Sequence, residues 1–316
     1  MAPIGIVAAA FISIQRYSDI ALPRLNSNLY YLIKYKMKSS SYNAISRYRY
    51  HTILLFSLAF LIITGYIWKN KHYHQTLEYV YENYDGVRLF HHWKEYASHY
   101  ELHLNMLMGK RDNSQEFRML EIGVSQGGSM EVWKRYFSGK NLYYVGMDIE
   151  KNCKRFEDEE RKVFIRIASQ LSENDLIKIC KDHGPFDFIV DDGGHSYEMM
   201  KTSIETLFPS DLCMTAQSLY VIEDMHTMVM KNQNSKIPDI PSEVFDRMHY
   251  YWYHHHLWHN VPRKNFRNLN QNDKKWADRV ESISLYDSMM FVHRGTGSGP
   301  LTQIKKGQFQ FKTKTG

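Results

Sequence analysis

Short apolar runs alternate with amphipathic segments through the middle of the chain. Five runs rich in β-branched and aromatic residues predict strands, at 117–123, 142–148, 163–167, 186–191 and 218–223. Segments with helical spacing between them predict helices, at 129–137, 175–181 and 198–208. Strands that alternate with helices favour a parallel sheet covered on both faces, the α/β class. Two more β runs lie within 283–293, around a turn-like Tyr-Asp-Ser.

A continuous apolar segment stands near the N-terminus. Residues 52–68 carry no charge over 17 positions, and an aromatic pair, Tyr66 and Trp68, lies at one end. A helix needs roughly 20 apolar residues to cross a bilayer, and aromatic side chains favour its interface. A buried core helix is the alternative, but the segment lacks a polar stripe. We therefore expect a single transmembrane helix.

The charges around this segment predict its orientation. Residues 1–51 hold seven Lys and Arg against one acidic residue, Asp19, whereas acidic residues soon balance the lysines after residue 68. Basic flanks stay on the cytosolic side of a membrane. The pattern predicts a cytosolic tail at 1–51, a signal anchor at 52–68 and a lumenal remainder. This is a single-pass type II arrangement, for which we expect the Golgi membrane.

The lumenal part divides further. A stem or cap over 69–108 is expected to be helical, because aromatic and apolar residues recur at three- and four-residue spacing. These residues are Trp93, Tyr96, Tyr100 and Leu104. Its histidines His92, His99 and His103 either pack in this helix or contribute to a site, and packing is favoured for most of them. A sheet domain at 109–294 and a mobile basic tail at 295–316 follow.

Composition excludes several classes of protein. Hydrophobic residues make up 43% and charged residues 23%, which excludes disorder throughout. The net charge of +6 is small and gathers at the chain ends, so it does not support a nucleic-acid binder. The three cysteines are far apart and form no CxxC pair, which excludes a disulfide miniprotein and a cysteine zinc site. Whether two of them pair stays open.

Two of the predicted strand ends fit a nucleoside. The first strand leads into Glu121-Ile-Gly123-Val-Ser-Gln-Gly127-Gly128-Ser129, where glycines let a ligand approach the backbone. Asp148 ends the second strand, where an acid can accept hydrogen bonds from ribose hydroxyls. The alternatives are a plain tight turn for the glycine loop and a helix cap for Asp148.

Two further strand ends each carry an acidic pair followed by a histidine. Asp191-Asp192-Gly-Gly-His195 follows the fourth strand, and Glu223-Asp224-Met-His226 follows the fifth. Crowded carboxylates resist ionisation unless a cation lies between them, and oxygen ligands suit a hard divalent ion. Helix caps and turns are the alternative for the acids. His226 is either a second base or a buried, hydrogen-bonded residue, and the second is favoured.

Together these motifs resemble a known enzyme family. The glycine loop, Val145-Gly-Met-Asp148-Ile, Asp187-Phe-Ile-Val-Asp-Asp-Gly-Gly-His195 and Leu219-Tyr-Val-Ile-Glu-Asp-Met-His226 resemble class I S-adenosylmethionine-dependent methyltransferases. Within that class they look like the metal-dependent sugar O-methyltransferases of macrolide biosynthesis and the cephalosporin hydroxylase-like group. The resemblance covers about 92–293. It implies a Rossmann-like sheet, S-adenosylmethionine, and a divalent cation, Mg²⁺ or Mn²⁺.

The resemblance also implies a role for each matching residue. The residues that would line the methionine part of the cofactor are Glu121, Gly123, Gln126, Gly127 and Ser129. Asp148 would bind the ribose, with Ile149 beside it. Ser169 and Gln170 would contact the adenine. Asp191, a weaker metal candidate, is placed with the cofactor residues. The metal ligands are Asp192, Glu223 and Asp224, and the general base is His195.

Three functions remain under consideration. The favoured one is methylation of a sugar hydroxyl on a glycan in the secretory pathway. The others are methylation of a small molecule or lipid at a membrane, and a catalytically silent binding module. The expected partners are a sugar-bearing substrate and the membrane, with no nucleic acid, and a homo-oligomer stays open. An aromatic and histidine patch at 251–258, which includes His254, His255 and His256, either stacks on a sugar or packs internally.

Overall fold

The computed structural model describes four stretches of the chain: 75–111, 115–229, 240–251 and 270–296. The chain divides into two units, 1–73 and 74–316, and all described residues belong to the second. Among them, no helix combines the length and the apolar character needed to cross a bilayer. The tail at 1–51, the anchor expected at 52–68, most of the patch at 251–258 and the end of the tail at 295–316 lie outside the described residues.

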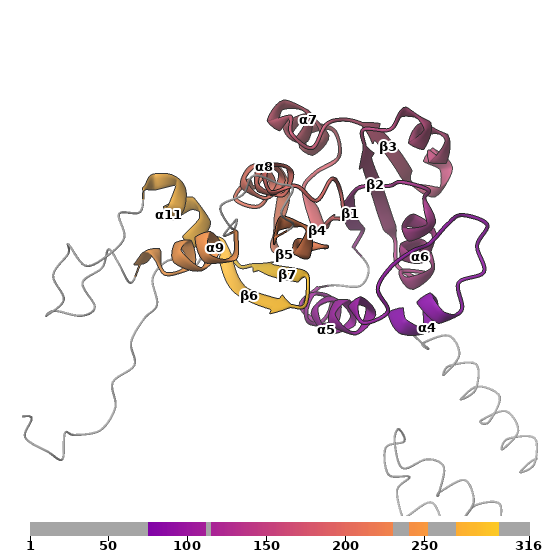
Figure 1. Ribbon diagram of the computed structural model, residues 1–316, viewed down its shortest axis with the longest axis horizontal. Coiled ribbons are helices and arrows are strands. Elements are labelled where there is room, and N and C mark those ends of the chain that lie inside the picture. Colours follow the sequence, from indigo (N-terminus) through magenta and orange to yellow (C-terminus); the bar gives the residue numbers. More distant parts are fainter. Residues whose placement is uncertain (1–74, 112–114, 230–239, 252–269, 297–316) are drawn as a thin grey trace, which may run out of the picture. The chain divides into compact units, whose positions relative to one another are not determined.

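A seven-stranded mixed sheet forms the centre of the described unit (Figure 1). Its order is β3-β2-β1-β4-β5-β7-β6, in which β1 to β5 are parallel and β7 is antiparallel to both neighbours. The strands are β1 (Phe117–Ile122), β2 (Leu142–Asp148), β3 (Val163–Ile167), β4 (Phe186–Asp191), β5 (Met214–Ile222), β6 (Val280–Tyr286) and β7 (Met289–Arg294). The predicted α/β fold and its strands are confirmed.

Helices cover both faces of the sheet, as the alternation predicts. Before the sheet come α4 (Leu77–Glu82) and α5 (Tyr96–Met108). Between the strands lie α6 (Gly128–Tyr136), α7 (Glu173–His183) and α8 (Tyr197–Leu207). Near the end are α9 (Ile240–Met248) and α11 (Gln271–Ala277), with short 3₁₀ turns η1 (Lys151–Phe156), η2 (Glu159–Arg161) and η3 (Met225–Val229).

The pleat of the sheet divides the core into two layers. Along β1, Met119 belongs to the apolar cluster with α4, α5 and α6, whereas Leu120 and Ile122 belong to the cluster with α7, α8, α9 and α11. Successive side chains on a strand point to opposite faces, so each buried strand supplies both clusters. Figure 1 shows α5 and α6 on one side of the sheet and α7 and α8 on the other.

The stem is less continuous than its spacing predicts. Instead of one helix, α4 ends at Glu82 and α5 begins at Tyr96, with a non-helical segment, 83–95, between them. Trp93 precedes α5 and is 54% exposed, so it does not share the buried stripe of Tyr100 and Leu104. The non-helical segment lies against the start of α6, because a Cβ on Gly128 would overlap the Leu89 carbonyl.

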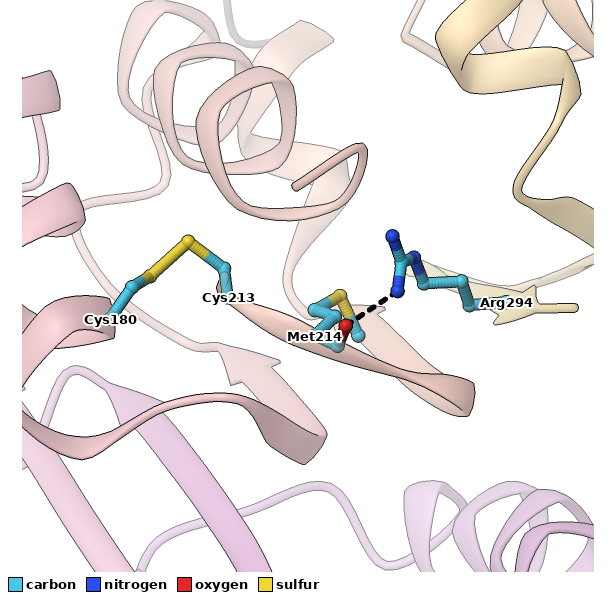
Figure 2. Close-up of a disulfide and its surroundings, with 4 residues drawn as sticks. All are labelled: Cys180, Cys213, Met214 and Arg294. Carbon is cyan, nitrogen blue, oxygen red and sulfur yellow. Dashed lines mark hydrogen bonds between the residues drawn. A yellow bond between two sulfur atoms is a disulfide. The ribbon is translucent and has the colours of Figure 1, made fainter. Parts of the chain in front are cut away.

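A disulfide joins α7 to the start of β5 (Figure 2). Cys180 and Cys213 are both buried, with their Cα atoms 4.8 Å apart and a sequence separation of 33. Next to it, the buried Arg294 of β7 donates to the Met214 carbonyl and to Asp211. The pairing that the sequence left open therefore joins α7 to the start of β5, and the Arg294 hydrogen bonds join β7 to the same region.

Candidate active site

Strand order brings the conspicuous loops together. Parallel strands β1, β4 and β5 are neighbours, so the loops that follow them meet at one edge of the sheet. Gly123, with φ +96°, lies against the loop after β4, and a Cβ there would overlap the Asp192 carbonyl oxygen. Glycine is therefore required at this position by both backbone conformation and close approach.

The two aspartates after β4 face opposite ways. Asp191 ends the strand on the α8 side, where its carboxylate accepts hydrogen bonds from Gln170 Nε2 at 2.6 Å, Tyr220 at 3.0 Å and Ser203. Burial raises the pKa of Asp191 to about 6. Asp192 lies on the α5 side instead. Asp191 therefore holds β4, β5 and α8 together through buried hydrogen bonds. The structure does not bring its carboxylate into the cluster around Asp192.

Asp192, His195 and Asp224 gather beyond β4 and β5. One ligand atom from each lies within 4.8 Å of the others, a spacing that suits a shared metal ion. His195 Nε2 is 3.8 Å from Asp192 Oδ1 and 3.9 Å from Asp224 Oδ2. The three residues lie beyond the carboxyl ends of β4 and β5, next to the topological switch point between β1 and β4, where ligands bind in open α/β sheets.

Glu223 and one residue from the stem extend this group. His92, Asp192 and Glu223 form a second trio with ligand atoms within 4.8 Å. His92 Nδ1 lies 3.4 Å from Glu223 Oε2, and its Nε2 lies 3.8 Å from Asp192 Oδ2. Together the two trios define an acidic cluster of three carboxylates and two histidines: His92, Asp192, His195, Glu223 and Asp224.

The electrostatics of the acidic cluster favour a bound cation. Burial, together with the charges of Glu223, Glu121 and Asp224, holds the pKa of Asp192 well above its ordinary value. Burial raises the pKa of Glu223 to about 8, with Asp224 adding to the shift. Burial lowers the pKa of both histidines. Neutral imidazoles beside crowded carboxylates are the donor set that a divalent ion stabilises.

Tyrosines from the stem orient two of the carboxylates. Tyr100 of α5 donates to Glu223 Oε1, and Tyr96 donates to Asp224 Oδ1 at 2.8 Å. The Tyr81 hydroxyl of α4 is buried and has no hydrogen-bond partner among the described residues. Burial raises its pKa, and the charges of Glu223 and Asp192 add to this. A buried hydroxyl without a partner is rare in folded proteins, so this one fits a bound group beside the carboxylates.

Two residues of the acidic cluster have a strained backbone conformation. His195 has φ 53° and Asp224 has φ 52°, a left-handed conformation that is uncommon for residues other than glycine. The Thr227 hydroxyl lies 2.7 Å from the His195 carbonyl and 2.8 Å from the Asp224 carbonyl, within donating distance of both. Such strain persists where the surroundings fix it, commonly at functional sites. No sequence pattern indicated this role for Thr227.

Asp148 organises the glycine loop. Its carboxylate accepts hydrogen bonds from the backbone N–H groups of Val124 at 2.9 Å, Ser125 at 2.8 Å and Glu150 at 2.8 Å. The acid at the end of β2 therefore ties the loop after β1 to its own strand. The adjacent Ile149 is 73% exposed, which leaves an apolar surface beside this acid.

The remaining residues assigned to the cofactor differ in exposure. Gln126 is exposed, whereas Gly123, Ser129 and Ser169 are half-buried and Gly127 is buried. The buried Glu121 accepts hydrogen bonds from Trp133 and Tyr144, and burial raises its pKa to about 7. Gln170 is also buried and accepts from the Gly194 N–H at 3.0 Å, which fixes the loop after β4. Glu121 and Gln170 thus support the loops from beneath.

His99 and His103 lie apart from the acidic cluster, whereas His226 borders it through Asp224. His99 stacks on Tyr286 with ring centroids 3.8 Å apart, and His103 contacts His293 at 2.8 Å between ring nitrogens. His226 is exposed, so the expectation that it is buried is wrong, but its contacts with the Ser288 hydroxyl confirm that it is hydrogen-bonded. Its Nδ1 also lies 4.0 Å from Asp224 Oδ1. Of the three stem histidines, His92, His99 and His103, only His92 contributes to the acidic cluster.

Comparisons with known proteins agree on one group of enzymes. No protein-family model matches the chain. It is 37% identical over 146 residues to mycinamicin VI 2''-O-methyltransferase of Micromonospora griseorubida, which covers 44% of this chain and 33% of that protein. It is 33% identical over 143 residues to demethylmacrocin O-methyltransferase of Streptomyces fradiae, covering 43% of this chain and 32% of that protein. The chain thus spans about a third of the length of these curated relatives.

A solved structure shares the fold. MycE methyltransferase from the mycinamycin biosynthetic pathway, in complex with Mg and S-adenosylhomocysteine, superposes with a TM-score of 0.54 at 24% identity. The superposition covers 71% of this chain and 56% of MycE. The chain therefore has the class I S-adenosylmethionine-dependent methyltransferase fold, and its sequence is related to the sugar O-methyltransferases of macrolide pathways.

Proposed function

We propose that the chain is an S-adenosylmethionine-dependent O-methyltransferase that acts on a sugar hydroxyl with the help of a divalent cation. The observation that carries the proposal is the convergence of Asp192, Glu223 and Asp224 with His195 beyond the carboxyl ends of β4 and β5. The glycine loop and Asp148, which fit the nucleoside cofactor, adjoin the same edge. The sugar O-methyltransferases to which the sequence is related support the substrate class.

The acidic cluster fits a cation, and the glycine loop beside it fits the cofactor. When bound, the cofactor supplies an electrophilic methyl group, and the cation supplies positive charge that favours loss of a hydroxyl proton. Asp192, Glu223 and Asp224 would hold the cation, because their oxygens crowd one point and because burial and neighbouring charge raise the pKa of Asp192 and of Glu223. Gly123 and Gly127 would let the cofactor approach the backbone at the start of α6.

His195 is placed to take the hydroxyl proton. An imidazole with an ordinary pKa near ~6.5 is unprotonated at neutral pH and can act as a general base. The Asp192 and Asp224 carboxylates, 3.8 and 3.9 Å from Nε2, would stabilise the imidazolium that results. The Thr227 hydroxyl holds the strained backbone that presents the ring. Aligning the oxygen, methyl and sulfur atoms then accounts for the remaining acceleration.

We also propose that this activity belongs to the lumen of the secretory pathway, with the chain anchored in the Golgi membrane by residues 52–68. The excess of basic residues before that segment supports the orientation. The Cys180–Cys213 disulfide adds support from the described unit, because disulfides persist in oxidising compartments and are rare in the cytosol. A glycan is then the natural sugar-bearing substrate. Methylation of a small molecule or lipid at the same membrane is the alternative.

A transfer assay tests the activity. The full chain in detergent is incubated with methyl-labelled S-adenosylmethionine and a panel of glycans, glycolipids and small glycosides, with and without a chelator. We expect label on a glycan, loss of transfer with the chelator, and recovery when Mg²⁺ or Mn²⁺ is restored. Transfer that survives chelation would remove the cation from the proposal. Cofactor binding without any transfer would favour a silent binding module.

The location has its own test. Protease treatment of sealed microsomes that contain the full chain should leave the 74–316 unit intact until detergent is added. Degradation without detergent would place this unit in the cytosol and overturn the proposed orientation, while leaving the transfer assay unaffected.

A further inference from the structure

The stem segment 83–95 carries a ring that points into the acidic cluster. His92 stacks on Phe90 with centroids 5.0 Å apart and an interplanar angle of 19°, and Tyr81 lies beside it at 5.8 Å. These aromatic contacts fix the ring so that Nδ1 faces Glu223 and Nε2 faces Asp192. Its side chain is 6% exposed, so water is largely excluded from this contact.

The distances around His92 suit coordination better than hydrogen bonding. Nitrogen–oxygen hydrogen bonds measure about 2.7–3.2 Å, whereas the His92 contacts measure 3.4 and 3.8 Å. Two ligands of one ion, each about 2.1 Å from it, lie about 3 Å apart when adjacent and about 4.2 Å apart when opposite. A histidine binds one ion through one nitrogen, and one ligand atom from each of His92, Asp192 and Glu223 lies within 4.8 Å of the others, which approaches this range.

A second, independent feature points to a bound group at the same place. The Tyr81 hydroxyl is buried without a partner among the described residues, although the charges of Glu223 and Asp192 reach it. Buried hydroxyls are nearly always satisfied, so a ligand or an ordered water is expected within its reach. Tyr81 and His92 are neighbours through their rings. The stem thus brings both a donor nitrogen and an unsatisfied hydroxyl to one side of the acidic cluster.

We infer that His92 is a fourth protein ligand of the cation held by Asp192, Glu223 and Asp224, and that its nitrogen turns the site's preference from Mg²⁺ towards a transition-metal dication such as Mn²⁺. The inference rests on the cation in the proposed function and goes beyond it by adding a ligand and a metal preference. Carboxylates alone suit Mg²⁺, which also keeps several waters, whereas imidazole suits first-row transition metals. Replacing a water by a neutral imidazole therefore favours the transition metal.

Pulsed electron paramagnetic resonance of Mn²⁺ tests this directly, because it detects a nitrogen-14 nucleus bound to the ion. We expect a nitrogen coupling in the full wild-type chain, its loss in His92→Gln, and its persistence in the matched variant His195→Gln. Mn²⁺ affinity, measured by titration of the free-ion signal, should fall at least about tenfold in His92→Gln, since even residues that only orient a ligand are worth about 10–100-fold. Mg²⁺ affinity, measured by competition, should fall less.

The outcomes separate this inference from the proposed function. A nitrogen coupling that disappears in His195→Gln but not in His92→Gln would assign the ligand to His195 and overturn the inference. Mn²⁺ binding with no nitrogen coupling would also overturn it, while the cation site would stand. No Mn²⁺ binding at all would remove the cation from the proposed function as well. Circular dichroism of His92→Gln checks that the variant is folded, and His92→Glu, which restores a donor oxygen, should bind Mn²⁺ without the coupling.

Discussion

Asp191 and Asp192 are adjacent in sequence but have opposite surroundings. Asp191 is enclosed by Ser203, Gln170 and Tyr220 beneath α8, whereas Asp192 lies in the acidic cluster. The period of two along a strand explains this, because consecutive side chains at the end of β4 point to opposite faces. The chemistry of a carboxylate at this edge is therefore set by which face of the sheet it occupies.

Matched substitutions at these two positions should separate a site residue from a structural one. Asp192→Asn is expected to weaken Mn²⁺ binding and to abolish methyl transfer, while cofactor binding and thermal stability change little, because it removes a charged oxygen from the cluster. Asp191→Asn is expected to lower the free energy of unfolding by about 1–3 kcal/mol, because it disturbs a buried hydrogen-bond network. Mn²⁺ binding should survive.

Denaturant unfolding, calorimetric cofactor binding and metal titration of both variants measure these effects. Equal loss of cofactor and metal binding in Asp192→Asn would place this residue in the wrong pocket. A stable Asp191→Asn that binds no metal would show that the two roles are exchanged.

At the scale of elements, α5 makes polar contacts with the rest of the fold near both of its ends. At one end, Tyr96 and Tyr100 hold the carboxylates of the site. At the other, His103 contacts His293 of β7 and the Tyr286 hydroxyl of β6, at 2.8 and 3.0 Å. A helix that is anchored on both the catalytic edge and the antiparallel strands keeps segment 83–95, and with it His92, in a fixed position.

The His103 contact predicts a pH-dependent stability. Burial, together with the His293 and His99 charges, lowers the pKa of His103 to about 4. The folded state therefore favours the neutral ring relative to the unfolded chain, where the pKa is near ~6.5. This contribution to stability is complete above about pH 6.5 and is lost as the pH falls towards 4.

Unfolding free energies measured from pH 7.5 to 4.5 check this. The wild type should lose stability faster on acidification than His103→Gln, which cannot take up the proton. Parallel curves for the two proteins would show that His103 does not titrate in this window.

At the scale of the whole described unit, a disulfide and the hydrogen bonds of Arg294 join elements at the end of the sheet opposite the acidic cluster. The disulfide links α7 to the start of β5, and Arg294 of β7 donates to the Met214 carbonyl beside it (Figure 2). Arg294 also donates to Asp211. Cys180 and Cys213 belong to the apolar cluster on the α7 and α8 face of the sheet. Loss of the disulfide should therefore affect stability before it affects the site.

Removing the disulfide gives the corresponding prediction. For a cross-link that spans 33 residues, loop entropy predicts a loss of about 3–4 kcal/mol in the free energy of unfolding when both cysteines become serine. Urea unfolding of the Cys180→Ser, Cys213→Ser double variant measures it, and Cys153→Ser, which removes the free buried cysteine, is the control. An unchanged urea midpoint would show that the disulfide adds no stability, and Mn²⁺ binding should be kept.

The alternation of apolar and amphipathic segments determined the fold without any tertiary information. The five parallel strands, the hairpin around Tyr286 and the helices between them could be predicted, because each segment's periodicity reflects a buried face that it must have in any such sheet. The same pattern placed the acids after β4 and β5 at one edge, because parallel strands end together. The period of a strand could also have separated Asp191 from Asp192.

Only the tertiary structure decided what those acids meet. His92 and Tyr81 lie more than 90 residues from Asp192 in sequence, and no local pattern marks a histidine as a neighbour of distant carboxylates. The same holds for the Tyr100–Glu223 hydrogen bond and the Cys180–Cys213 disulfide, each of which joins segments that the fold alone brings together. Local periodicity indicates which face of an element is buried, whereas the residues that this face contacts depend on how the elements pack. The strands and the acids at their ends could therefore be predicted from the sequence, but the residues around those acids could not.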